Sequence, residues 1–223
     1  MSELHIEKIS YDMAKPFILQ IHYARRMPCV QYAFGLFAQA SLIGVVTYGQ
    51  PASPSVCKGI AGEENRHRVL ELNRLVIKEG SPKNSASFLV SHSLKLLPKD
   101  YFIVSYADTA WGHCGYVYQA TNWLYTGMTN GRTDEAGING GHPRHGNGDN
   151  TKRTYRSPKY RYVFITGNHK KQNQKLLRWK VIDEYPKGDN TRYDTNNPVP
   201  IDSRVITNKQ EEESKYRDTD LWG

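Results

Sequence analysis

The chain has 223 residues, 38% of them apolar, with a formal net charge of +8 and three cysteines. This length suits one domain with a substantial core. The sequence has no run of eighteen apolar residues, so we expect no membrane span. The first ten residues lack the apolar core of a signal peptide, and three irregularly spaced cysteines do not predict a disulfide framework, so we expect a protein of a reducing cytoplasm.

The basic charge is concentrated in one segment of the chain. Residues 128–180 contain twelve Lys/Arg and three Asp/Glu, a net charge of +9, so the rest of the chain is close to neutral. Tyr155, Tyr160 and Tyr162 are interleaved with this charge, as stacking on nucleic-acid bases requires. The alternative is a surface loop whose charge serves only solubility. The pattern favours a surface that contacts phosphates.

The first half of the chain predicts one helix and three strands. Residues 1–10 are typical of a strand, and Asp12–Met27 of a helix that Pro28 ends. Residues 34–48 predict a β-hairpin that turns at Ala40 and Ser41. Residues 49–65 are rich in Pro, Ser and Gly and predict a loop. The strand that follows, residues 68–77, carries Arg74 among its apolar residues.

The second half predicts two further strand–helix units. After a loop, Asn84 or Ser85 is expected to cap a helix over 87–97. The pattern then predicts a strand over 101–106, a helix over 115–125 and a last strand over 159–166. Residues 126–150 are dominated by Gly, Asn and His and predict a mobile excursion. The order of the elements indicates an α/β protein with a mixed sheet.

Reactive side chains gather around the predicted helix 115–125. Helical spacing would place Tyr118, Asn122 and Tyr125 on one face, and Asp108 would share that cleft from the end of the preceding strand. A tyrosine with a pKa near 10 can protonate a departing thiolate, and a carboxylate can accept a proton from an amine. The alternative is that the tyrosines are core residues and that Asp108 caps the helix.

Two other places in the sequence are candidates for ligand binding. The loop before the helix 87–97 would offer free N–H groups and the charge of Lys83 to a phosphate. This loop lacks the glycine-rich motifs of nucleotide-binding loops, so the local sequence alone favours an ordinary capped turn. His22 and Tyr23, followed by two arginines, are also typical of a plain helix C-terminus.

Metal binding has little support in the sequence. His113 and Cys114, together with His142 and His145, match no closed zinc site, since no paired cysteine motif is present. A site for a single metal ion that uses His22 and Asp108 is the alternative.

Several stretches of the chain together resemble a known family. ELNRLVI, SPKNSASFLVSHSLKLLP and IVSYADTAWGHCGYVYQATNWLYTG are similar to the Mom family of DNA-modification proteins of Mu-like bacteriophages. HYARRMP, SPKYRYVFITG and YPKGDNTRYD add to the resemblance, which spans about residues 18–194. The residues 130–152 look least like the family.

The resemblance implies a GNAT-like fold, the acyl-CoA N-acyltransferase fold, with a mixed central β-sheet flanked by helices. It implies one catalytic domain over 1–167, in which 128–158 form a basic excursion that contacts DNA, and a basic C-terminal extension over 168–223 with a disordered end. The implied activity is the transfer of a carbamoylmethyl (acetamido) group to adenine N6 in phage DNA. The enzyme would use acetyl-CoA in the cytoplasm of the infected bacterium and protect the DNA from restriction.

The resemblance also assigns residues to roles. The implied catalytic positions are His22, Tyr23, Arg74, Asp108 and Tyr118. The strands 70–77 and 101–107 would separate around acetyl-CoA, and the implied cofactor contacts are Leu75, Val76, Ile77, Lys83, Asn84, Ser85, Ser87, Ser105 and Asn122. The implied contacts to the DNA backbone are Arg132, Arg144, Lys152, Arg153, Arg156, Lys159 and Arg161.

The implied chemistry is not ordinary acyl transfer. Adenine N6 is a poor nucleophile, and a carbamoylmethyl product needs a bond at the acetyl methyl carbon and a nitrogen source. Iron held by His22 and Asp108 is one hypothesis for this step. The base must also leave the duplex stack, so we expect base flipping or action on single strands. The alternatives are acylation of another amine (an aminated pyrimidine, a free nucleotide or aminoacyl-tRNA) and a DNA-binding relative without catalysis.

Overall fold

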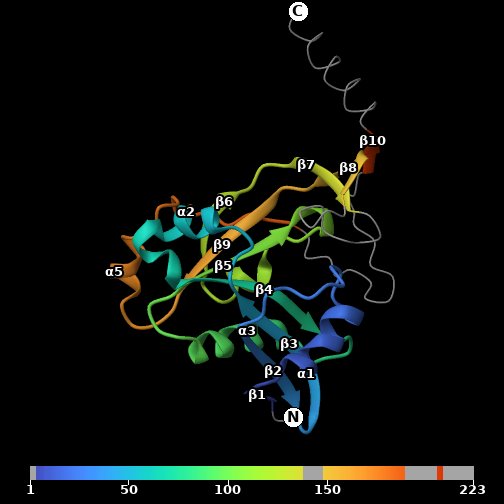
Figure 1. The fold of residues 1–223 in the computed structure, drawn as a ribbon. Coiled ribbons are helices and arrows are strands. Elements are labelled where there is room, and N and C mark those ends of the chain that lie inside the picture. The colour runs from blue at the N-terminus through green and yellow to red at the C-terminus, as the bar shows by residue number, and fades with distance from the viewer. Residues whose placement is uncertain (1–3, 138–147, 189–204, 208–223) are drawn as a thin grey trace, which may run out of the picture.

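A seven-stranded mixed sheet organises the protein (Figure 1). The computed structural model describes residues 4–137, 148–188 and 205–207. In sheet order the strands are β1 (Leu4–Lys8), β2 (Tyr32–Ala38), β3 (Ser41–Gly49), β4 (Val69–Ile77), β5 (Phe102–Asp108), β9 (Lys159–Ile165) and β6 (Leu124–Met128). Neighbouring strands are antiparallel except β4 and β5, which are parallel. The predicted α/β class, with a mixed central sheet flanked by helices, is confirmed.

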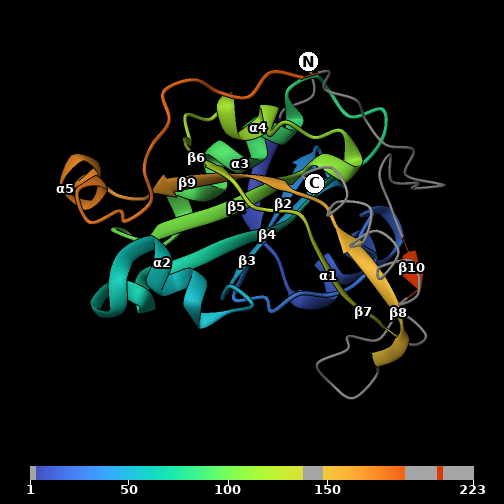
Figure 2. The ribbon, with the colours of Figure 1, turned by 90° about the horizontal axis from the view of Figure 1, so that it is seen from above.

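Helices cover both faces of this sheet (Figure 2). They are α1 (Tyr11–Pro16), which continues as a π-helical turn (Phe17–Ile21), α2 (Pro54–Asn65), α3 (Ser85–Leu96), α4 (Tyr116–Gln119) and α5 (Lys170–Gln174). Two 3-10 turns, Arg66–Arg68 and Thr109–Trp111, follow α2 and β5. Within the described residues, no helix is long and apolar enough to cross a membrane.

Alternation along the central strands decides which residues meet which helix. On β4 and β5, Leu70, Leu72 and Ile103 pack in one core with residues of α3. Val69 and Val104 point the other way and pack in a core with residues of α2. Each fully buried Leu or Ile side chain contributes about 1.5–3 kcal/mol to folding. The two faces of the sheet are therefore held by separate cores.

The strands β4 and β5 pair only at one end and then diverge. Their register contains three pairs and ends at Glu71–Val104. Beyond that point β4 pairs with β3 as far as Ile77, whereas β5 pairs with β9 as far as Asp108. The two strands leave a V-shaped gap between them, which we call the divergence. Because a sheet rarely leaves two central strand edges unpaired, this gap is the first candidate for a ligand site.

A second, three-stranded sheet extends from the main one (Figures 1 and 2). It contains β7 (Arg132–Gly137), β8 (Gly148–Arg156) and β10 (Val205–Thr207) in the order β10-β8-β7. The prediction that all of 126–150 is a structureless excursion is therefore wrong for the two paired strands and for β6. Residues 138–147 lie outside the described residues, and so does the whole end predicted to be disordered, residues 209–223.

Three predicted elements differ from the structure. The helix predicted over Asp12–Met27 ends at Ile21, because His22 has an extended backbone. The predicted loop 49–65 contains α2, which buries Cys57, Ile60 and Ala61 at helical spacing on one face. The helix predicted over 115–125 has four residues, and Tyr125 belongs to β6. The strands predicted over 68–77, 101–106 and 159–166 and the helix over 87–97 are confirmed, each within about two residues, but no side chain of the described residues caps the start of that helix.

Candidate active site at the divergence of two strands

A buried hydroxyl group stands where β4 and β5 separate. Ser105 Oγ lies 2.8 Å from the Leu72 carbonyl oxygen and 2.7 Å from the Tyr118 hydroxyl, and Ser105 is 1% exposed. A carbonyl oxygen can only accept, and serine has one proton. Ser105 therefore donates to Leu72, and the Tyr118 hydroxyl donates to Ser105. This chain supplies the hydrogen bond that strand pairing no longer gives to the Leu72 carbonyl.

Tyr118 lies in α4, on the face of the sheet that α3 also covers. Its ring packs against Trp123 and Tyr162, with centroid distances of 5.0 and 5.2 Å. Burial raises the pKa of Tyr118 to about 12, against a smaller opposing effect of the hydrogen bond with Ser105. The tyrosine stays protonated near neutral pH, so it can give a proton to a strong base at the divergence.

The loop between β4 and α3, together with the first turn of α3, carries four of the predicted cofactor contacts. Asn84 has a left-handed backbone, and its side chain does not cap the first turn of α3. Ser85 donates to the Pro82 carbonyl (2.7 Å) and Ser87 to the Asn84 carbonyl (3.0 Å), whereas Lys83 is exposed. Ser81 Oγ is buried without a hydrogen-bond partner in the part of the chain that the structure describes. The loop thus presents an uncapped helix start and an unsatisfied hydroxyl.

The predicted cofactor contacts on β4 lie along the divergence. Leu75, Val76 and Ile77 pair with β3 on one side only, and the register with β5 ends at Glu71. Their other edge faces the gap, where a ligand with amide groups would find backbone partners. Asn122 lies elsewhere, in an exposed turn after α4 with a left-handed backbone (φ 60°). It does not share a helical face with Tyr118, so the basis for that prediction is lost.

Four aromatic rings gather near the open end of the divergence. Tyr23 lies between His22 and Trp111, with centroid distances of 4.3 and 4.6 Å, and its ring meets His113 edge-on at 6.0 Å. His22 and Tyr23 come from the extended segment after the π-helical turn, whereas Trp111 follows β5. We call these four residues the aromatic cluster. Sequence reasoning named His22 and Tyr23 but gave Trp111 no role.

His22 is held as a neutral ring. The Ala24 N–H donates to its Nδ1 (3.0 Å), so that nitrogen is an acceptor and the proton is on Nε2. Burial lowers the pKa of His22 to about 3, and the charges of Arg74 and His113 act in the same direction. His22 is therefore neither a cation nor a ready base near neutral pH. It offers an N–H donor.

Arg74 fastens the aromatic cluster to β4. Its guanidinium donates to the Arg26 carbonyl from Nε (3.2 Å) and Nη2 (3.1 Å), and to the Asn73 carbonyl from Nη1 (2.6 Å). Burial is the main effect that lowers the pKa of Arg74. The structure therefore brings His22, Tyr23 and Arg74 close together.

Asp108 is on the opposite face of β5 from the hydroxyl chain. Alternation places it with Val104, on the side that α2 covers, whereas Ser105 faces Tyr118. The carboxylate forms an ion pair with Lys159, accepts a hydrogen bond from Ser157, and accepts from the Ala110 N–H at 3.0 Å. The predicted cleft with Asp108 and Tyr118 on one face is wrong.

Glu71 is a residue of this region that sequence reasoning missed. It occupies the last β4–β5 pair and points to the same face as Val69. Burial raises the pKa of Glu71 to about 7, against smaller opposing effects of Arg74 and Lys159. A charged residue inside the alternating stretch LELNRLVI was the available signal, and it also drew attention to Arg74.

The residues proposed for iron do not fit a metal ion in this arrangement. A metal at His22 Nε2 would need the ring proton on Nδ1, which already accepts from the Ala24 N–H. Asp108 is engaged by Lys159 and Ser157. Among the described residues, no group of three or more His, Cys, Asp or Glu could hold a metal ion. The iron hypothesis therefore gains no support.

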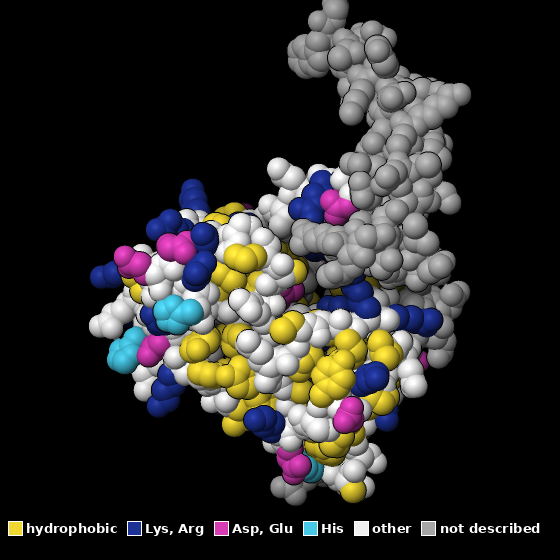
Figure 3. Space-filling model, in the orientation of Figure 1, with side chains coloured by type: hydrophobic (Ala, Val, Ile, Leu, Met, Phe, Trp, Pro, Cys, Tyr) yellow, Lys and Arg dark blue, Asp and Glu magenta, His cyan; other side chains and the backbone are white. Residues whose placement is uncertain are grey.

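The predicted DNA contacts differ in how free their charges are. Arg132 and Arg156 each lie 3.2 Å from an oxygen of Asp134. Lys159 is ion-paired with Asp108, and Arg161 donates to Thr126 and lies 3.5 Å above the Trp179 ring. Lys152 and Arg153 are in β8, and Arg144 lies outside the described residues. Lys and Arg side chains are spread around the visible face in Figure 3, while apolar side chains gather over α3 and β1–β3.

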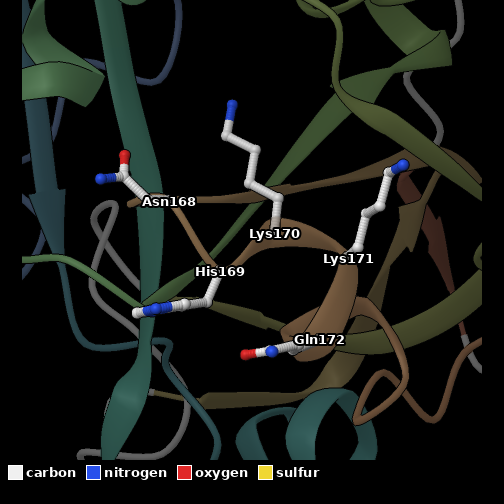
Figure 4. Close-up of a pocket in the computed structure, with 5 residues that line it drawn as sticks. All are labelled: Asn168, His169, Lys170, Lys171 and Gln172. Carbon is white, nitrogen blue, oxygen red and sulfur yellow. The ribbon is translucent and has the colours of Figure 1, made fainter.

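A cavity of about 400 Å³ lies away from the divergence, at α5, and residues 168–172 line it. Figure 4 shows the side chains of Lys170 and Lys171 extended beside it. His169 faces Asp100 (3.3 Å), and Lys170 Nζ lies 4.4 Å from the Phe164 ring centroid. None of the predicted site residues lines this cavity, so it is a surface hollow apart from the candidate site.

Comparisons with solved structures give distant likenesses. The Arabidopsis thaliana protein NAA60 in complex with acetyl-CoA is 12% identical, covers 73% of this chain and 98% of its own, and has a TM-score of 0.49. A Bacillus subtilis acetyltransferase in complex with CoA is 14% identical, covers 74% of this chain and all of its own, and has a TM-score of 0.43.

Comparisons of the sequence are more specific. The chain is 33% identical over 130 residues to the methylcarbamoylase Mom of Escherichia phage Mu, and the match covers 56% of this chain. The chain spans about half the length of that relative, 54% of it. The model of the Mom protein family matches residues 3–187, which include every strand of the main sheet and the whole divergence. The chain therefore belongs to the Mom protein family.

Proposed function

We propose that the protein is a DNA-modifying enzyme that uses acetyl-CoA to place an acetamido-type group on adenine N6 and so protects phage DNA from restriction. The observation that carries the proposal is the divergence of β4 and β5, with the buried chain Tyr118–Ser105–Leu72 at its apex. The sequence similarity of the chain to a methylcarbamoylase supports the same activity. Such an enzyme would act in the cytoplasm of the infected cell.

The residues along the divergence suit acetyl-CoA. The unpaired edge of Leu75–Ile77 matches the amides of an extended pantetheine arm. The uncapped start of α3, with the unsatisfied hydroxyl of Ser81 and the exposed Lys83, suits a pyrophosphate. When bound, the cofactor would supply a two-carbon unit activated by its bond to sulfur. Ser85 and Ser87 would shape the loop, because their hydroxyls hold backbone carbonyls.

The chain's own groups would act on protons and orientation. Tyr118 would hold a proton next to the departing sulfur, since its high pKa keeps it protonated. Arg74 would fix the segment that carries His22 and Tyr23. The Nε2–H of His22 would orient an acceptor atom of the substrate, and the aromatic cluster would offer a flat surface to a base.

The DNA would reach the site from the face opposite α3. An adenine inside a duplex must leave the stack before its N6 can enter the gap. Among the predicted DNA contacts that the structure describes, Arg132 and Arg156 on the second sheet form ion pairs only with Asp134, whose carboxylate they share. We expect them to hold DNA phosphates together with Lys152 and Arg153 of β8. The affinity for DNA should therefore fall as the salt concentration rises.

The test is mass spectrometry of nucleosides from plasmid DNA after expression of the chain. Wild type should yield a heavier deoxyadenosine. Tyr118→Phe should reduce its amount by about 10²–10⁴-fold, because a positioned acid typically contributes that factor. The matched control is Tyr116→Phe, which removes an exposed hydroxyl from the same helix and should leave the product unchanged.

The outcomes separate the alternatives. Acylation of another amine would replace the proposed modification of adenine if a pyrimidine were modified. The same holds if a free nucleotide or tRNA were modified while the DNA stayed unmodified. Unmodified nucleic acid in every sample, together with salt-sensitive DNA binding, would favour a DNA-binding relative without catalysis. Equal product from wild type and Tyr118→Phe would contradict the role proposed for Tyr118.

A further inference from the structure

A carboxyl group to which the family resemblance gives no role lies at the apex of the divergence. Glu71 and Val104 form the last pair that joins β4 to β5. Glu71 points to the face that α2 covers, as Val69 does, whereas Leu70 and Leu72 point to α3. An amine that approaches the gap from the face opposite α3 therefore meets Glu71 at the point where the strands part.

The two carboxyl groups of this face are held in different ways. Asp108 is engaged by the Lys159 ammonium, the Ser157 hydroxyl and the Ala110 N–H. Within residues 4–137 and 148–188, the side-chain carboxyl group of Glu71 has no hydrogen bond and no ion pair. A carboxylate whose oxygens are already bonded is a poor acceptor for a further proton, whereas the oxygens of Glu71 are available.

The surroundings of Glu71 combine burial with two cations. The titratable and charged groups on its own side of the sheet are Arg74 on β4, Tyr106 on β5, Lys159 on β9 and Cys57 on α2, while Tyr118 on α4 senses its charge from the other face. Burial raises its pKa to about 7, while Arg74 and Lys159 oppose that rise. A group that is half ionised at working pH can both take up and release a proton.

We propose that Glu71 accepts the proton of the substrate's exocyclic amine and that Asp108 is a positioning residue, which holds Lys159 beside it. This inference rests on the proposed function, because it needs an amine as the substrate. In this step one N–H bond of the amine breaks, and its proton passes to a Glu71 oxygen. The electron pair of the broken bond stays on nitrogen, so the step is a proton transfer from the amine to the carboxylate, with no change of oxidation state. Glu71 then releases the proton to water, so this proton transfer consumes no other reactant.

The test is the rate of base modification by the full chain as a function of pH, for wild type, Glu71→Gln and the control Glu64→Gln. Glu64 is an exposed carboxylate of α2, outside the site. For wild type, kcat/KM should rise through about pH 7 and then level off, because the ionised carboxylate is the active form. Glu71→Gln should lower the plateau by about 10²–10⁴-fold and remove the rise. Glu64→Gln should match wild type.

The positioning role of Asp108 has its own readout. Asp108→Asn frees the Lys159 ammonium, whose remaining carboxylate neighbour is Glu71. The pKa of Glu71 should then fall, so the midpoint of the pH profile should move to lower pH. A merely structural loss would reduce the rate and leave the midpoint in place, and that result would overturn the role of Asp108.

Failure of the inference can be told apart from failure of the proposed function. Glu71→Gln within about threefold of wild type, with the same midpoint, would overturn the inference while the activity stands. Absence of any modified base with wild type would overturn both. A ¹³C NMR titration of Glu71 in the intact chain needs no activity: a midpoint near the ordinary glutamate value of about 4.3 would refute the role of Glu71.

Discussion

Ser105→Ala tests whether one buried hydroxyl stabilises the divergence of β4 and β5. The substitution removes the group that donates to the Leu72 carbonyl and accepts from the Tyr118 hydroxyl. Ser105 is 1% exposed, so bulk water cannot replace it. Each buried polar group that loses its partner costs about 1–3 kcal/mol, and two are affected here. We expect the free energy of unfolding to fall by about 2–5 kcal/mol.

Urea titration followed by tryptophan fluorescence measures this change, with the slope m as a check that the unfolded state is unaffected. The matched control is Ser87→Ala, which removes a hydroxyl bonded only to the Asn84 carbonyl at the first turn of α3. Its effect should stay within about 0.5 kcal/mol. A loss below about 1 kcal/mol for Ser105→Ala would refute the reasoning, because both orphaned groups would then have found new partners.

Two further predictions concern the residues around the gap. Gly115→Ala should destabilise the fold by about 3 kcal/mol, because Gly115 has φ 85° and a Cβ there would lie 2.3 Å from the Tyr162 ring. Gly80→Ala (φ 74°, with open space around it) should show the backbone strain alone in the same urea titration; equal losses would contradict the clash. Glu71→Gln should stabilise the protein at pH 8 by up to about 3 kcal/mol, because burial raises the folded-state pKa from 4.5 to about 7. The folded state then binds the proton more tightly than the unfolded one, so the gain should shrink as pH falls from 7 towards 4.5 in urea titrations at each pH; a constant gain would contradict this.

The strands of the main sheet could be predicted from sequence because alternation is a local signal. The stretch LELNRLVI sends Leu70 and Leu72 to one core and Val69 to the other, as its pattern implies. The helix α2 could not be predicted with the same ease. Its segment is rich in Gly, Ser and Pro, and its buried face becomes visible only when Cys57 and Ile60 pack against the sheet.

The resemblance named candidate site residues, and their geometry comes from the folded structure. His22, Tyr23 and Arg74 lie close together because Arg74 donates to a carbonyl of the segment that follows Tyr23. The relation of Asp108 to Tyr118 depends on which face of β5 each one meets and on a helix that has four residues. No local pattern gives the pairing of Asp108 with Lys159, which is 51 residues away in the chain. For the same reason, only the folded structure shows that the carboxyl group of Glu71 has no hydrogen-bond or ion-pair partner among the described residues.

In the proposed reaction, the divergence would let one sheet hold both the acid and the base. Tyr118, with a pKa of about 12, retains its proton on the α3 face, while Glu71, with a pKa of about 7, is available on the opposite face. A continuous sheet would keep two such groups apart, because alternate residues face opposite sides. Where the strands part, a substrate can enter from one face and a leaving group can meet the other. The gap that Ser105 stabilises through the Leu72 carbonyl is therefore the structural condition for the proposed chemistry.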